Sequence, residues 1–262
     1  MEAKANRLLV LPIFLLVLLS SCSKHLGDAP KWRVKDLAAA PYPKIRLLSG
    51  HERVVATVDR ITIQKLLLAK LRIARTANVN AELYVEAGKA PNAYAGYTPG
   101  VPGYGPNGKP ILGITTGMLA LLGNNTDAGA ALLGHEIAHF TKGHHESAKK
   151  RSTTLNAIGQ AAALGLAAAG IPMSGYITGF AVDLIDSAYS RDQEREADEA
   201  GMDYMIAAGY NPKASLYLHE ELMKASGGAL LPFLSTHPSG NERIASLEKM
   251  LQERGYSTNV QP

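Results

Sequence analysis

The sequence is poor in cysteine, in aromatic residues and in long apolar stretches. Its 262 residues include one cysteine and one tryptophan, and aromatic side chains make up 6% of the chain. A single cysteine cannot form a disulfide within the chain, which excludes a disulfide-stabilised fold. Apolar residues reach 46% and charged residues 19%, so the chain can bury one substantial core and is not of the disordered class.

Charge of one sign is not in large excess either. The formal net charge is +4, and the pattern of lysine and arginine indicates scattered residues rather than a stripe. Nucleic-acid binding usually requires a basic patch or stripe. We therefore expect no nucleic-acid partner.

An apolar run near the N-terminus is too short to cross a membrane. It extends over 12 residues from Leu8 to Leu19 and follows Lys4 and Arg7, whereas a transmembrane helix needs roughly 18 residues or more. A short basic segment followed by such a run is typical of a signal peptide. We predict that residues 1–21 form one.

The end of this run resembles a bacterial lipobox. Leu19-Ser20-Ser21-Cys22 consists of an aliphatic residue, two small residues and the only cysteine of the chain. The resemblance implies acylation of Cys22 and a lipid anchor to the membrane. Serine at position 23, where aspartate would favour inner-membrane retention, implies export to the outer membrane. The alternative is an ordinary cleaved secretory signal with an incidental cysteine.

Beyond the signal, the sequence predicts an α+β fold that is mostly helical. Residues 22–55, which contain several prolines, predict a tether and irregular structure. In residues 56–256, segments with apolar residues at helical spacing are separated by short segments in which apolar and polar residues alternate, as in strands. The expected helices are 59–75, 116–122, 128–142, 192–208, 212–225 and 239–254, and the expected strands are 82–86, 92–97 and 111–115. A Gly/Pro-rich loop is expected at 98–110 and a buried or cleft-lining helix at 155–170.

Two histidines one helical turn apart predict a metal site. His135 and His139 are four positions apart, so they share one face of a helix and their nitrogens can reach one zinc ion at about 2.0–2.1 Å. Glu136 follows the first histidine. Zinc would lower the pKa of a water toward about 7, and Glu136 would take its proton as a general base. The neighbouring residues are apolar, so this helix is expected to be buried, and its polar side chains then need partners such as a metal.

Catalytic zinc needs a third protein ligand, and the spacing leaves His145 as one candidate. It lies six residues after His139, which is the metzincin spacing HExxHxxGxxH. That pattern requires glycine at position 142 to end the helix. This chain has lysine there, and Gly143 comes one place late.

The other candidate for the third ligand is Glu194, in a later predicted helix. Asp198 follows four positions on, so both carboxylates can face the metal helix. Asp198 would accept a hydrogen bond from the distal nitrogen of His135 and fix its tautomer. Glu196 competes with Glu194 as a ligand, and a solvated charged helix face would also explain these acidic residues.

Together these motifs resemble the gluzincin metallopeptidases, which include the CAAX prenyl endopeptidase and the heat-shock protease HtpX. The resemblance covers most of residues 60–250 and best fits the soluble periplasmic branch of BepA-like and lipoprotein proteases. It implies a zincin-type metallopeptidase domain at residues 56–256, with a small β-sheet beside the active-site helix, and it favours Glu194 over His145. The matching segments are His135-Glu-Ile-Ala-His139, Ser190-Arg-x-x-Glu194-x-x-Ala-Asp198, Pro91-Asn-Ala-Tyr-Ala95, Gly143-His144, Thr236-His-Pro238 and Arg243.

The resemblance also implies roles for His237 and for a substrate strand. In the periplasmic branch a histidine in the Thr-His-Pro context approaches the zinc. His237 would then be a fourth ligand that keeps the enzyme latent, or a donor to the transition-state oxyanion. A histidine at a helix start with no catalytic part is the alternative. By analogy of fold, residues 111–115 would be the edge strand along which substrate lies.

The function implied is a zinc-dependent endopeptidase with one Zn2+ per chain, acting on misfolded or misassembled proteins of the bacterial envelope. Expected partners are polypeptide substrates, the membrane and the outer-membrane assembly machinery. One alternative is a chaperone-like periplasmic binding protein with latent protease activity, although holding a client needs no general base such as Glu136. Another is a metal-dependent hydrolase of a non-peptide bond.

Overall fold

A computed structural model describes residues 30–49, 52–98, 108–147, 189–227, 231–238 and 240–259. The predicted signal peptide, Cys22, the predicted helix at 155–170 and most of the 98–110 loop lie outside these ranges. Within the described ranges, none of the helices combines the length and the apolar character needed to span a bilayer. The fold is α+β and mostly helical, as predicted.

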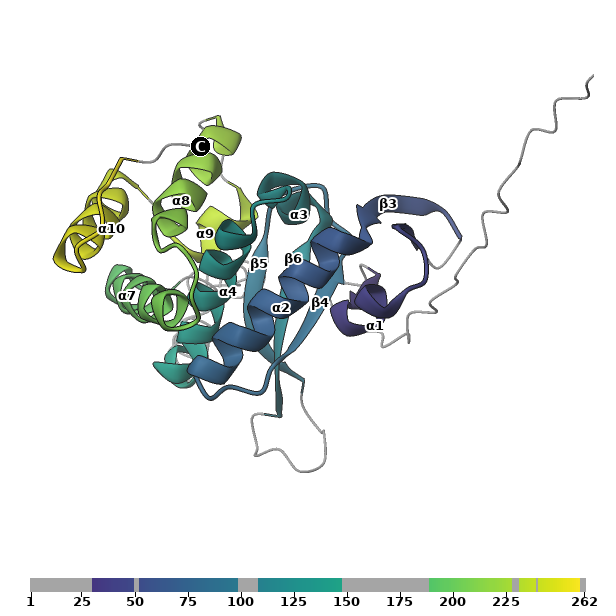
Figure 1. The fold of residues 1–262 in the computed structure, drawn as a ribbon, viewed down its shortest axis with the longest axis horizontal. Coiled ribbons are helices and arrows are strands. Elements are labelled where there is room, and N and C mark those ends of the chain that lie inside the picture. The colour runs from purple at the N-terminus through teal and green to yellow at the C-terminus, as the bar shows by residue number, and fades with distance from the viewer. Residues whose placement is uncertain are drawn as a thin grey trace, which may run out of the picture.

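A four-stranded mixed sheet lies at the centre of the described fold (Figure 1). Its order is β1 (Lys31–Arg33), β4 (Glu82–Glu86), β6 (Lys109–Thr115) and β5 (Ala93–Thr98). Strands β4 and β6 are parallel, whereas β1 and β5 are antiparallel to their neighbours. The prediction that residues 111–115 form an edge strand is wrong, because β6 pairs on both sides. Among the described strands, β5 forms that edge instead.

Two helices, α2 (Arg60–Thr76) and α4 (Thr126–Thr141), lie side by side, and α4 crosses the β5–β6 side of the sheet (Figure 1). Asn125 caps α4, since its side chain accepts a hydrogen bond from the backbone N–H of Ala128. Every residue of α4 from Ala128 to His139 is buried. The predicted burial of the motif helix is therefore confirmed. The short helix α3 (Thr116–Leu122) connects β6 to α4.

The C-terminal helices enclose α4 from the side away from α2. Helix α7 (Arg191–Ala207) packs along α4 and begins with a capping box between Ser190 and Gln193. Helix α8 (Lys213–Ser226) also contacts α4, and α10 (Asn241–Glu253) covers α7 and α8 (Figure 1). These three helices confirm the predicted ones. The short helix α9 (Pro232–Thr236) was not predicted, because its five residues are too few to show helical periodicity.

The prediction of irregular structure between residues 22 and 55 is wrong for residues 31–48. Strand β1 leads into α1 (Val34–Ala39), and β2 (Lys44–Leu48) pairs with β3 (Val54–Asp59). Trp32, Val34 and Leu37 are buried in the main core. The prolines at 41 and 43 lie in the turn between α1 and β2, where they interrupt no hydrogen-bonded ladder.

Candidate metal centre

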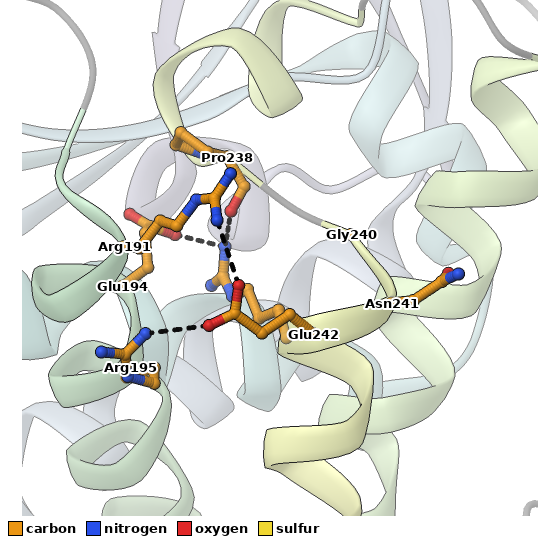
Figure 2. Close-up of a pocket in the computed structure, with 8 residues that line it drawn as sticks. Arg191, Glu194, Arg195, Pro238, Gly240, Asn241 and Glu242 are labelled. Carbon is orange, nitrogen blue, oxygen red and sulfur yellow. Dashed lines mark hydrogen bonds and ion pairs between the residues drawn. The ribbon is translucent and has the colours of Figure 1, made fainter.

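Helix α4 places its two motif histidines on one buried face. His135 and His139 are 5% and 0% exposed, and their rings meet edge to face at 4.8 Å. Helix α7 brings Glu194 opposite them, and the residue after α9, His237, comes from the third side. Figure 2 shows Glu194 with the side chains that surround it on the α7–α10 side.

Four ligand atoms converge between these elements. One nitrogen from each of three histidines and one oxygen of Glu194 lie within 4.8 Å of one another. Nε2 of His135 lies 3.1 Å from Nε2 of His139 and 3.2 Å from Nδ1 of His237. Glu194 Oε1 lies 3.1 Å from His237 Nδ1 and 3.6 Å from His139 Nε2. A tetrahedral site with bonds of about 2.0–2.2 Å spaces its ligand atoms by about 3.3–3.5 Å, so these residues fit a zinc-sized ion.

The tautomer of His135 is fixed by Asp198, as predicted from their positions. Nδ1 of His135 donates to Oδ1 of Asp198 at 3.0 Å, and both side chains are buried. The lone pair of its other nitrogen, Nε2, then points at the cluster.

The tautomer of His139 is fixed by a second chain of hydrogen bonds. His144 Nε2 donates to the carboxylate of Glu196 at 3.1 Å, which in a neutral ring makes His144 Nδ1 the acceptor. It accepts from Nδ1 of His139 at 2.8 Å, which leaves Nε2 of His139 with a lone pair facing the cluster. Glu196, the competitor for the third ligand, thus lies outside the cluster and has a half-exposed side chain.

These lone pairs cannot satisfy one another. Nε2 of His135 and Nε2 of His139 are both acceptors at 3.1 Å, a contact that repels unless a cation or a proton lies between them. Burial lowers the pKa of His139 well below its usual value, helped by the neighbouring His135, and burial lowers the pKa of His135 as well. Because protons are disfavoured there, a metal ion is the partner that the donor set requires.

Arg243 on α10 holds the two carboxylates of α7. Its Nε and Nη2 donate to the two oxygens of Asp198 at 2.6 and 2.7 Å, and its Nη1 forms an ion pair with Glu194. Burial alone would raise the pKa of Asp198, but Arg243 overrides it and holds that pKa well below its ordinary range. Asp198 therefore stays ionised. The sequence resemblance contained Arg243 but gave it no role.

Glu136 lies beside the cluster and faces the edge strand. It is 1% exposed, and neither of its carboxylate oxygens meets a side-chain hydrogen-bond partner among the described residues. The Nε2 of His237 is 3.5 Å from its Oε1. Burial and the charge of Glu194 raise the pKa of Glu136 to about 8, although Arg243 and the backbone of Ala95 on β5 oppose the rise.

His145 lies outside the group of ligand atoms. Its ring packs against Tyr97 and Phe140, and its Nδ1 is 3.5 Å from the hydroxyl of Tyr189. Burial lowers the pKa of His145 to about 4. The ring of Tyr189 also stacks on His139 at 3.8 Å. Nothing in the sequence marked Tyr189 as part of the site, because it belongs to no motif or periodic helix face.

A pocket of about 310 Å³ reaches the centre from the α7–α10 side. Glu194 and Arg243 line its inner part (Figure 2). At its rim, Arg191 and Arg195 form ion pairs with Glu242. These rim side chains are largely exposed, so their ion pairs add little stability.

A helix that carries His-Glu-x-x-His, with a glutamate from a second helix at the same point, defines a metallopeptidase of the gluzincin type. The chain belongs to peptidase family M48, whose sequence profile matches residues 62–251.

Three relatives illustrate the range of the family. The chain is 32% identical over 211 residues to the mitochondrial metalloendopeptidase OMA1 of Schizosaccharomyces pombe, which covers 79% of this chain and 56% of that protein. It is 26% identical over 125 residues to the metalloprotease LoiP of Escherichia coli, 48% of this chain and 50% of the relative. It is 31% identical over 131 residues to a putative beta-barrel assembly-enhancing protease of Vibrio cholerae, 44% of this chain and 25% of the relative. The chain thus spans about half or less of the length of these relatives.

Proposed function

We propose that this chain is a zinc-dependent endopeptidase with one zinc ion, held by His135, His139 and Glu194. The proposal is supported by the spacing of the ligand atoms and by the short distance between the facing Nε2 atoms of His135 and His139. When bound, zinc supplies a Lewis acid that polarises a peptide carbonyl and acidifies a water. Asp198 keeps His135 in the tautomer that presents Nε2, and Arg243 keeps Asp198 ionised.

The observation that carries the proposal is the position of Glu136. It lies beside the ligand cluster without belonging to it, and unlike Asp198 it meets no side-chain hydrogen-bond partner among the described residues. Its pKa of about 8 in the protein without metal shows how strongly the pocket resists an isolated negative charge there. A carboxylate in such a place can take a proton from the attacking water and pass it to the leaving amine.

We place the substrate on β5. This strand pairs with β6 on one side only, so among the described strands its other edge has backbone groups available. The backbone of Ala95 lies close enough to Glu136 to influence its pKa. An extended peptide added antiparallel to or parallel with β5 would therefore pass the general base, with its backbone held by main-chain hydrogen bonds.

His237 supports a latent form of the enzyme. Its Nδ1 is 3.2 Å from Nε2 of His135 and 3.1 Å from Oε1 of Glu194. These distances are those between ligands of one metal ion. They favour a fourth ligand over a hydrogen-bond donor to the oxyanion, which would lie farther from the metal. Its ring stacks on Phe233 at 4.5 Å, which holds it in this place. A fourth protein ligand closes the position that water needs, so His237 must move before catalysis.

We further propose that the chain works at the outer membrane of a bacterial envelope, anchored through Cys22, on misfolded or misassembled polypeptides. The lipobox resemblance supports the place. The family relationship to bacterial metalloproteases, one with a name that refers to β-barrel assembly, supports the substrate class.

The test is the isosteric variant Glu136→Gln, compared with wild type and with the exposed control Glu253→Gln on α10. Casein cleavage should vanish in Glu136→Gln, while zinc content and client binding persist, because the amide cannot accept the proton. Glu253→Gln should cleave at the wild-type rate. Cleavage by Glu136→Gln at the wild-type rate would contradict the mechanism.

The closed position of His237 favours a second candidate function, a chaperone-like protein that holds clients and cleaves rarely. The same variant separates the two. If wild type and Glu136→Gln protect an outer-membrane protein from aggregation equally well, and neither cleaves it, holding is the main activity.

A further inference from the structure

Exposed large apolar side chains are concentrated in one part of the described structure. All five of them lie between residues 54 and 71, on β3 and α2, with exposed fractions between 40% and 61%. They are Val54, Val55, Ile61, Leu68 and Leu71. Singly exposed apolar residues are common, but the gathering of five on two consecutive elements, three of them on α2, marks an interaction surface.

On α2 these side chains share a face with basic residues. Helical spacing aligns Ile61, Leu68 and Leu71 with Lys65, Arg72 and Arg75, and all six are exposed. We call these six residues the α2 outer face. The opposite side of the helix carries Ile63, Leu66 and Ile73, which are buried in the core. The outer apolar residues are therefore not required for packing within the described fold.

Helix α2 contains no acidic residue. Five of its 17 residues are lysine or arginine. Neither Lys65 nor Arg75 forms an ion pair with another described residue, and Arg72 lies over the ring of Tyr210 at 5.9 Å. On a soluble helix face, basic residues are usually interspersed with acidic ones, so a face that combines aliphatic and basic side chains without a carboxylate favours an anionic partner with an apolar layer.

The N-terminal part of the described chain, which includes α2, is also positively charged as a whole. Residues 30–76 contain eleven lysines and arginines and three acidic residues, whereas residues 77–262 contain 13 lysines and arginines and 18 acidic residues. The expectation of scattered basic residues is therefore wrong for residues 30–76, which form β1, α1, the β2–β3 hairpin and α2 and carry an excess of positive charge. An anionic surface would attract this part and repel the rest.

We propose that the α2 outer face binds the surface of an anionic membrane. Its leucines and isoleucine would enter the boundary between headgroups and acyl chains, and Lys65, Arg72 and Arg75 would lie among the phosphates. The exposed apolar side chains are aliphatic, which suits lipid, whereas single-stranded nucleic acid is bound by aromatic side chains that stack on bases. The α2 outer face contains no residue of the metal centre.

The length of the N-terminal chain agrees with this placement. Lys31 lies nine positions after Cys22, so the chain between them can span at most about 30 Å when fully extended. Strand β1 leads directly into α1, which packs against α2. If Cys22 is acylated, a point that rests on the proposed function, the bilayer lies within reach of the α2 outer face.

The test uses the full chain with Cys22→Ser, which removes its only thiol, and Leu68→Cys, which carries an environment-sensitive fluorophore. Vesicles of phosphatidylcholine alone are compared with vesicles that also contain phosphatidylglycerol. The emission should shift to the blue with the anionic vesicles only, and added salt should weaken the shift. A fluorophore at the exposed Ala245→Cys on α10 should not shift. Sedimentation measures separately how much chain attaches through its N-terminal apolar run.

Charge variants in the labelled chain make the test specific. Lys65→Gln with Arg75→Gln should raise the vesicle concentration for half-maximal shift about 30-fold, given the attraction of each basic residue to an anionic surface. The control pair Lys224→Gln with Lys249→Gln, on exposed parts of α8 and α10, should leave it unchanged.

Three results would overturn the proposal. One is that the chain sediments with anionic vesicles while the emission of the fluorophore at position 68 does not shift. Another is an equal shift with phosphatidylcholine alone. The third is a shift without vesicles that grows with protein concentration, which would assign the face to a second copy of the chain. None of these readouts uses catalysis or acylation, so a failure here is distinct from a failure of the proposed endopeptidase.

Discussion

Gly134 on α4 and Gly201 on α7 bring the two helices of the metal centre into backbone contact. A Cβ atom on Gly134 would lie 2.9 Å from the carbonyl oxygen of Gly201, closer than side chains tolerate. Gly134 precedes His135, and Gly201 lies seven positions, about two helical turns, after Glu194. The missing side chains therefore set the distance at which Glu194 meets the histidines.

Gly134→Ala should destabilise the protein by about 1–3 kcal/mol, because the new methyl group meets rigid backbone and must push α7 away. Urea unfolding measures the loss, and zinc content should fall with it. Gly129→Ala on the same helix is the control. Its methyl group would meet only the end of the Leu66 side chain at 3.3 Å, so stability should stay equal or rise by up to about 1 kcal/mol. Equal losses of stability in both variants would show that the backbone contact between Gly134 and Gly201 is not the cause.

Asp198→Asn should weaken zinc binding by about 10- to 100-fold, since the amide no longer fixes the tautomer of His135 and leaves Arg243 with one carboxylate fewer. Competition with a chromophoric chelator measures the affinity. Asp203→Asn on the same helix changes an exposed carboxylate paired with Arg254, and its zinc affinity should match wild type. Unchanged affinity in Asp198→Asn would show that His135 needs no such partner.

His237→Ala should increase the rate of casein cleavage, because it removes the side chain that lies at the fourth ligand position. The increase should appear in kcat, with zinc still bound through the other three ligands. A fall in kcat with KM unchanged would instead assign His237 to stabilisation of the transition-state oxyanion.

Metal-free protein should lose stability as the pH falls below about 6.5, in part through His219. Burial, with help from Arg243, lowers the pKa of His219 to about 3; its Nδ1 donates to the carbonyl of Ser215, and its Nε2 meets no described partner. Since the folded pKa is below the unfolded one, the unfolded chain binds the proton more tightly. Stability from this group is full above the unfolded pKa and declines by about 1.4 kcal/mol per pH unit below it.

His219→Gln should flatten this dependence. Urea unfolding of the metal-free protein between about pH 7 and pH 5 gives both slopes. The remaining slope should reflect other buried histidines, such as His237, whose pKa burial and Arg243 lower to about 3. Parallel curves for wild type and His219→Gln would show that His219 is accessible to protons in the folded state.

The elements that carry the site could be predicted because their signals are local. The helical period fixes His135 and His139 on one face whatever surrounds them. Apolar spacing predicted α2, α4 and α7 to within two residues of their observed ends. The N-terminal elements β1, α1, β2 and β3 were missed, since three to six residues carry too short a pattern for either period.

The sequence by itself determined the helix that carries His135 and His139, the place of Glu136 beside them and the class of fold, because the spacing within one helix is set by backbone geometry. Only the tertiary structure decided which distant residue completes the cluster. From spacing alone His145 and Glu194 were both open, and the contact at Gly134 and Gly201 brings Glu194 to the cluster while His145 packs among aromatic rings. It also decided that β5, not β6, is the edge strand beside Glu136. Such choices depend on packing between elements far apart in the chain, which no local period encodes.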